Sequence, residues 1–137
     1  DPAPLSYLKS DSPNGYDITL EVTLQSVAMD SPQIISRSNM KHLYWTMKQM
    51  LAHHTVTGCN MRTGDLCGTG TISGPTEDSF GSLLELTWRG EKPIQLPNAE
   101  TRKFLQDGDM VVMKGYCQGD GYRVGFGEVT GKIFPAK

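Results

Sequence analysis

The chain has 137 residues, and its 13 Lys and Arg residues nearly balance its 15 Asp and Glu residues, for a formal net charge of -2. The basic residues form no stripe that could displace counterions from phosphates, which excludes a nucleic-acid partner. No apolar run approaches the ~18 residues needed to span a bilayer, so we expect a soluble chain without a membrane partner.

The first 15 residues are expected to be a loop or an incoming linker, because prolines and a glycine stand among small polar residues. The remaining stretch, 16–137, has the length of one compact domain, whose core should bury roughly two-thirds of the surface of the unfolded chain. Since the sequence begins at Asp1 rather than at a methionine, we also expect a further segment upstream of it.

Two elements are predicted in the first half of the chain. Apolar and polar residues alternate over 18–24, which is typical of a half-buried β-strand. Apolar residues then recur at every third or fourth position over 38–54, which predicts one face of an α-helix. Ser36 or Ser38 could cap the start of this helix, and Gly58 is placed to end it.

The second half of the chain reads as short β-segments separated by glycine and proline. The segments are 68–72, 83–88, 110–117, 122–129 and 132–134. Between two of them, Asp120 and Gly121 suit a tight hairpin, because glycine accepts positive φ freely. The sequence therefore predicts a mostly β fold with one main α-helix packed on it.

The glycine-rich segment 119–131 and the histidines are better explained by structural roles than by ligand binding. No amphipathic helix follows these glycines to offer its N-terminus to a phosphate, so we expect turns and close strand packing. The side chains of His53 and His54 diverge by about 100° on a helix and do not share a metal. One of them is expected to bond to the backbone where the helix ends, and His42 is given a structural role as well.

Two other sets of side chains indicate no site. The charged residues from Arg102 to Asp109 flank a turn at Gly108 and are expected to form a solvated surface with weak ion pairs. Three cysteines lack Cys-x-x-Cys spacing, which favours reduced thiols in a cytosolic protein over zinc binding: Cys59, Cys67 and Cys117.

Glu85 and Thr71 are the two residues for which a functional role stays open. Glu85 lies in the predicted strand 83–88, where its carboxylate either faces water, which the pattern favours, or is buried and paired. A buried carboxylate would suit an enzyme that needs a base or an orienting group. Thr71 lies among the small residues of 68–75, where the pattern favours a turn and a ligand-binding hydroxyl is the alternative.

Seven segments, in this order, resemble the C-terminal portion of eukaryotic-type members of the fumarylacetoacetase (fumarylacetoacetate hydrolase) family. They are 38–46 (SNMKHLYWT), 53–60 (HHTVTGCN), 64–66 (GDL), 70–75 (GTISGP), 81–86 (GSLLEL), 101–105 (TRKFL) and 115–127 (GYCQGDGYRVGFG). The resemblance extends from the proline-rich start to the end of the chain. It implies part of a mixed β-sandwich or roll catalytic domain.

The resemblance also implies an activity, the hydrolysis of a carbon–carbon bond of 4-fumarylacetoacetate to fumarate and acetoacetate in tyrosine and phenylalanine catabolism. It implies a cytosolic homodimer that acts on this small diketo acid and uses a divalent cation, Mg²⁺ or Ca²⁺, held by carboxylates. In this family a His paired with a Glu activates water for attack on a carbonyl. Glu85 falls on that glutamate, which favours its buried form, and Thr71 falls on the threonine that contacts the substrate.

Much of the family's active site does not map onto this sequence. The catalytic His, the metal-binding carboxylates and a small N-terminal barrel belong upstream, and His53 and His54 do not replace that His. The chain supplies no metal ligand, so we expect the 137 residues alone to be inactive. A non-catalytic β-rich binding module, or a related acylpyruvate hydrolase or decarboxylase, stays open as an alternative.

Overall fold

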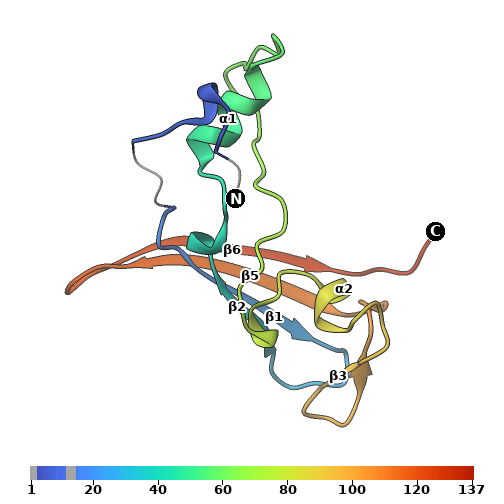
Figure 1. Ribbon diagram of the computed structural model, residues 1–137. Helices are drawn as coiled ribbons and strands as arrows, with labels where there is room; N and C mark the ends of the chain where they lie inside the picture. The colour runs from blue at the N-terminus through green and yellow to red at the C-terminus, as the bar shows by residue number, and fades with distance from the viewer. Residues whose placement is uncertain (1–2, 12–14) are drawn as a thin grey trace.

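A four-stranded antiparallel sheet forms the body of the computed structural model, which describes residues 3–11 and 15–137 (Figure 1). Its strands run in the order β2 (Gln33–Asn39), β1 (Thr19–Gln25), β5 (Met110–Gln118) and β6 (Arg123–Lys132). A separate two-stranded sheet pairs β3 (Ile94–Gln95) with β4 (Thr101–Arg102). The predicted mostly β fold with one main helix is confirmed.

The long strands of the sheet are the elements that the local sequence predicts best. The expected strand at 18–24 is β1, and 110–117 is β5. The predicted hairpin closes between β5 and β6, where the Gly119 N–H donates to the Tyr122 carbonyl at 2.9 Å and Gly121 has φ +73°. The segment predicted at 122–129 extends to Lys132 as one strand, β6, and the strand predicted at 132–134 does not form beyond its first residue.

The predicted helix over 38–54 begins too early. The chain stays extended through β2, which pairs with β1 from Gln33 to Asn39, and continues into a short 3-10 helix, η2 (Met40–His42). The main helix, α1, covers only Met47–Thr55 and is capped by Thr46 in a capping box with Gln49. Ladder pairing with β1 keeps Ser38 and Asn39 extended, and neither predicted serine cap is used.

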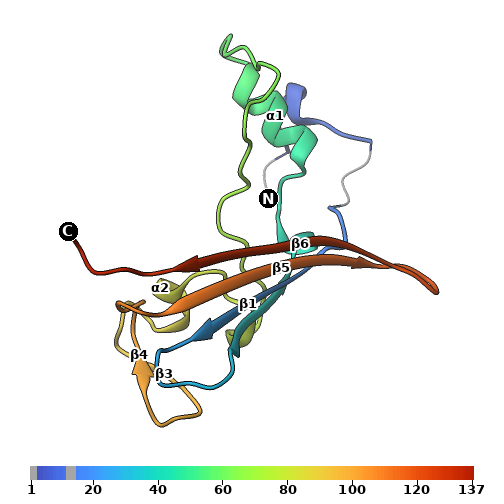
Figure 2. The ribbon, with the colours of Figure 1, turned by 180° about the vertical axis from the view of Figure 1, so that it is seen from behind.

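Helix α1 does not pack on the sheet as expected. It stands away from the sheet in opposite views (Figures 1 and 2) and packs against η1 (Ser6–Leu8) in the leading segment. The Gln49 side chain donates to the Leu8 carbonyl at 2.8 Å, and no residue of α1 is buried. Gly58 follows the helix end with φ +86°, as predicted. Positions 1–2 and 12–14 of the expected loop lie outside the described residues.

Two further β-segments predicted from the sequence are not strands. Residues 68–72 form no regular element, and the segment expected at 83–88 begins with a one-turn helix, α2 (Leu83–Leu86). The Ser82 hydroxyl accepts from the Glu85 N–H at 3.3 Å and so caps this helix. The cap and the positive φ values of Trp88 and Arg89 turn the chain away from an extended path.

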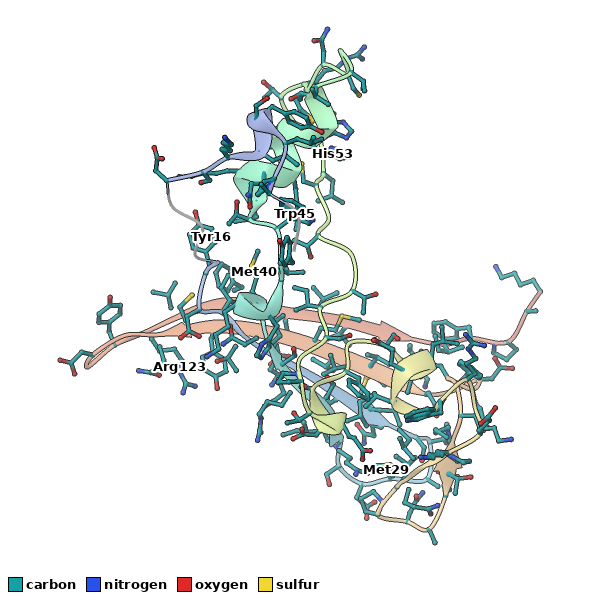
Figure 3. All side chains as sticks on the ribbon, viewed as in Figure 1. Tyr16, Met29, Met40, Trp45, His53 and Arg123 are labelled. Atoms are coloured by element: carbon teal, nitrogen blue, oxygen red, sulfur yellow. The ribbon has the colours of Figure 1, made fainter. Side chains whose placement is uncertain are left out.

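The hydrophobic core is smaller than expected, because the fold buries less than the predicted two-thirds of the surface of the unfolded chain. The accessible surface is 10080 Å², whereas a compact monomer of 15.1 kDa should expose only about 7,100 Å². Leu24, Met29 and Leu96 form one small cluster, and Met40 lies apart from it (Figure 3). Every described residue of β6 is exposed, so the outer part of the sheet has no apolar cover.

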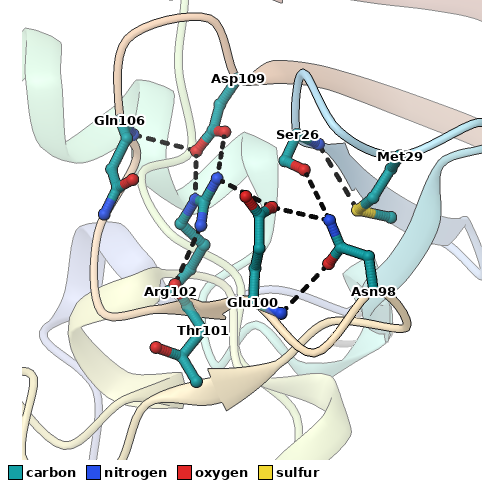
Figure 4. Close-up of polar contacts among 8 residues, drawn as sticks. All are labelled: Ser26, Met29, Asn98, Glu100, Thr101, Arg102, Gln106 and Asp109. Atoms are coloured by element: carbon teal, nitrogen blue, oxygen red, sulfur yellow. Dashed lines mark hydrogen bonds and ion pairs between the residues drawn. The ribbon is translucent and has the colours of Figure 1, made fainter.

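A buried ion pair replaces the solvated surface expected between Arg102 and Asp109 (Figure 4). Arg102 donates from Nε to Asp109 Oδ2 at 2.9 Å and from Nη2 to Oδ1 at 3.0 Å, with side-chain exposures of only 8% and 1%. The Gln106 N–H donates to the same carboxylate at 2.9 Å. The prediction was wrong because the turn folds back over the β4 arginine, which local sequence does not reveal.

Candidate active-site pocket

Glu85 lies on α2 instead of on a strand, and hydroxyl groups hold its carboxylate. Glu85 Oε2 accepts from Ser73 Oγ at 2.7 Å and from Ser82 Oγ at 3.1 Å. Oε1 accepts no hydrogen bond from the part of the chain that the structure describes. Glu85 is exposed, so the solvent-facing form is the one observed and the buried form is not.

Ser73 connects Glu85 to the loop that precedes α2. Its hydroxyl oxygen also accepts from the Gly81 N–H at 3.1 Å, while the Ser36 hydroxyl of β2 donates to the Phe80 carbonyl at 2.8 Å. A Cβ at position 81 would collide with the Ile72 carbonyl oxygen, so glycine is required for the loop to approach this backbone. The sheet thereby fixes the position of α2 through β2.

Thr71 and Glu85 lie in the wall of one open pocket of about 470 Å³. Ser73 and Ser82 line the same pocket, and His42 joins them from η2. The two residues singled out from the sequence are therefore brought together, although 14 positions separate them. A carboxylate with one oxygen bound and the other open can orient a further donor, and a threonine hydroxyl can donate to a ligand oxygen.

Ser73, Ser82 and His42 are pocket residues that the sequence reasoning missed. The serines lie inside the segments 70–75 and 81–86, so the motif signal was present, but no pattern indicated that their hydroxyls point to Glu85. His42 was assigned a structural role, yet it lines the pocket. Local spacing could not reveal this, because η2 and α2 meet only in the folded chain.

Residues 3–133 match a family model described as fumarylacetoacetate (FAA) hydrolase, C-terminal. The chain belongs to the fumarylacetoacetate hydrolase family. It is 57% identical over 136 residues to the fumarylacetoacetase of Homo sapiens, 58% to that of Arabidopsis thaliana and 52% to that of Caenorhabditis elegans. Each alignment covers 99% of this chain but 32% of the relative, so the chain spans about a third of the length of these curated relatives.

The potential metal ligands of this fumarylacetoacetate hydrolase family member do not cluster in the part of the chain that the structure describes. Within residues 3–11 and 15–137, no three His, Cys, Asp or Glu side chains gather as a set of metal ligands. No helix of the same residues is long and apolar enough to cross a membrane. The described residues therefore do not form the divalent-cation site that the family resemblance implies.

The two adjacent histidines bond to different side chains. His53 Nδ1 lies 3.0 Å from the Tyr7 hydroxyl, with the two rings stacked, whereas His54 Nε2 lies 3.2 Å from Cys59 Sγ. The expected bond from one histidine to the backbone at the helix end is replaced by these side-chain contacts. The three cysteines are free thiols, as the spacing predicted.

Proposed function

We propose that this chain is part of a hydrolase that cleaves a carbon–carbon bond of 4-fumarylacetoacetate to give fumarate and acetoacetate. The observation that carries the proposal is the shared pocket of Thr71 and Glu85, in which two hydroxyls fix the glutamate carboxylate. The relatives named fumarylacetoacetase support the choice of reaction. We further propose a cytosolic homodimer as the working form of the full-length protein.

In this proposal Glu85 orients a catalytic histidine that another part of the full-length protein supplies. With Oε2 bound by Ser73 and Ser82, the open Oε1 is free to accept a hydrogen bond from an imidazole N–H. The oriented imidazole takes a proton from water, which attacks a carbonyl of the diketo acid. The Thr71 hydroxyl donates to a substrate oxygen in the same pocket.

The exposure of Glu85 and of the β6 strand fits a chain that meets more protein in the whole enzyme. The surface excess over a compact monomer, together with the 32% coverage of the relatives, supports this interpretation. A divalent cation, Mg²⁺ or Ca²⁺, is proposed for the full-length protein only, with ligands from outside this chain. Because the described residues do not form such a site, no step above depends on the cation.

The test is an assay of the full-length protein and of the 137-residue chain with 4-fumarylacetoacetate. We expect the full-length protein to release fumarate and acetoacetate in equal amounts and the 137 residues alone to release neither. Turnover of an acylpyruvate in preference to 4-fumarylacetoacetate would favour a related hydrolase or decarboxylase. Failure of the full-length protein to turn over any diketo acid would favour a binding module and contradict the proposal.

Replacing Thr71 with valine in the full-length protein should mainly weaken substrate binding. The change keeps the shape of the side chain and removes the hydroxyl, leaving a substrate oxygen unpaired at a cost of about 1–3 kcal/mol. This corresponds to a KM or Kd raised roughly 5- to 150-fold, with a smaller change in kcat. Steady-state kinetics measures the effect. The matched control is Thr69→Val, because Thr69 lies two residues away and its hydroxyl donates to the Gly70 carbonyl. Equal effects of both changes would contradict the assigned contact.

A further inference from the structure

The Ser73 hydroxyl joins the segment that carries Thr71 to the carboxylate of Glu85. It donates to Glu85 Oε2 at 2.7 Å, although 12 positions separate the two residues. The same hydroxyl oxygen accepts from the Gly81 N–H at 3.1 Å. An N–H group can only donate, so the single hydrogen of the Ser73 hydroxyl goes to the carboxylate. The hydroxyl is thereby held between a fixed donor and a fixed acceptor.

Ser82 donates to the same carboxylate oxygen at 3.1 Å, but it holds Glu85 in a different way. Ser82 is the N-cap of α2, and its hydroxyl oxygen accepts from the Glu85 N–H at 3.3 Å. Both contacts stay within the first turn of α2, so they fix the carboxylate relative to this helix alone. Ser73 lies outside α2, and its bond fixes the carboxylate relative to the segment of Thr71.

Close packing at Gly81 holds the segment of Thr71 against the start of α2. A Cβ at position 81 would collide with the Ile72 carbonyl oxygen and would lie 2.8 Å from Thr71 Cγ2. Glycine therefore lets the two backbones approach closely enough for the Gly81 N–H to reach the Ser73 hydroxyl. One set of contacts thus fixes both Thr71 and the hydroxyl that holds Glu85, and all three side chains line the same pocket.

We propose that Ser73 is a positioning residue that sets the place of the Glu85 carboxylate relative to Thr71. The inference rests on the proposed function, in which Thr71 contacts the substrate and Glu85 orients the imidazole that activates water. These two groups must be held in register, because a misplacement of about 1 Å can lower a rate about 100-fold. Without the Ser73 hydroxyl, the exposed Glu85 side chain can turn with α2 away from the substrate contact.

The test begins with steady-state kinetics of Ser73→Ala in the full-length protein with 4-fumarylacetoacetate. We expect kcat to fall about 10- to 100-fold. KM should stay within about threefold, because the Thr71 hydroxyl is retained. Ser82→Ala should lower kcat less, and it should also lower the melting temperature because α2 loses its N-cap. Ser31→Ala, in the exposed loop between β1 and β2, is the matched control and should leave kcat and KM unchanged.

A double-variant cycle then separates positioning of the carboxylate from general support of the loop. Glu85→Ala leaves no carboxylate to position, so adding Ser73→Ala to it should change the residual kcat, measured at high protein concentration, by less than about twofold. An equal loss of kcat with and without the Glu85 carboxylate would overturn the proposal.

Two further results would also overturn it. One is an unchanged kcat in a folded Ser73→Ala protein, and the other is a loss of kcat in Ser82→Ala at least as large as in Ser73→Ala. Turnover by the original protein without an effect of Ser73→Ala would contradict this inference alone. No turnover of 4-fumarylacetoacetate by the original protein would contradict the proposed function itself.

Discussion

Replacing Glu85 with glutamine in the full-length protein should lower kcat by about 10²–10⁴-fold while the protein stays folded. Glutamine has the shape of glutamate, and its amide oxygen can still accept hydrogen bonds from the Ser73 and Ser82 hydroxyls. In the original protein these hydroxyl oxygens lie 2.7 and 3.1 Å from Glu85 Oε2. The amide is neutral, so it no longer stabilises the imidazolium that forms when the catalytic histidine takes a proton. The loss should therefore fall on kcat and much less on KM.

The same Glu→Gln change at an exposed glutamate outside the pocket is the matched control. Glu91 is such a residue, and Glu91→Gln should leave both kcat and KM close to their original values. Steady-state kinetics and a thermal melt are recorded for both variants, so that a folding defect is separated from a catalytic one. A folded Glu85→Gln protein whose kcat stays within threefold of the original would refute the assigned role.

Replacing Arg102 with methionine should lower the free energy of unfolding by about 3–5 kcal/mol. The change removes both charged hydrogen bonds to Asp109 and leaves a carboxylate that is almost fully buried, to which the Gln106 N–H still donates. An uncompensated buried charge is costly because the interior cannot replace the hydration it has lost. Methionine keeps much of the side-chain volume, so the loss reports on the charge more than on packing.

Urea unfolding measures this effect, and an exposed ion pair provides the control. Lys114 Nζ lies only 2.7 Å from Glu128 Oε1, closer than the Arg102–Asp109 contacts, but the two side chains are 44% and 55% exposed. Lys114→Met should leave the free energy of unfolding nearly unchanged, because solvent screens an exposed pair. The double variant Arg102→Met/Asp109→Leu should recover part of the loss. Equal losses for Arg102→Met and Lys114→Met would show that burial does not set the strength of the pair.

The buried pair should also give stability a characteristic pH dependence. Burial raises the pKa of Asp109, but hydrogen bonds from Arg102 and from the Gln106 N–H outweigh it, so the pKa lies below its usual value of 3.8. A carboxyl group whose pKa is lower in the folded state contributes its full stabilisation at pH values above its unfolded-state pKa. This contribution is lost as the pH falls through the folded-state pKa. Without Arg102, burial favours the protonated carboxyl, so Asp109 of Arg102→Met takes up its proton at a higher pH than Asp109 of the original protein. The gap in stability between the two proteins should therefore narrow as the pH falls and close below the lowered folded-state pKa of Asp109 in the original protein.

Local sequence patterns determined the elements whose geometry depends on near neighbours. The alternation over 18–24 predicted β1, the Asp120-Gly121 pair predicted the β5–β6 hairpin, and Gly58 marked the end of α1. Steric limits on φ and the two-residue period of a strand act within a few residues, so a linear sequence is enough to read them. The ordered motifs likewise identified the family and directed attention to Thr71 and Glu85.

Only the tertiary structure decided the features that join distant segments. Pairing with β1 made residues 33–39 a strand although their neighbours have helical spacing, and the fold brought the Ser73 hydroxyl to the Glu85 carboxylate, twelve residues away. The folded-back turn buried Arg102 against Asp109. The tertiary structure also decided that Thr71, Glu85 and His42 line one pocket. Burial and hydrogen-bond partners depend on which surfaces meet in the fold, and residue spacing along the chain does not encode that.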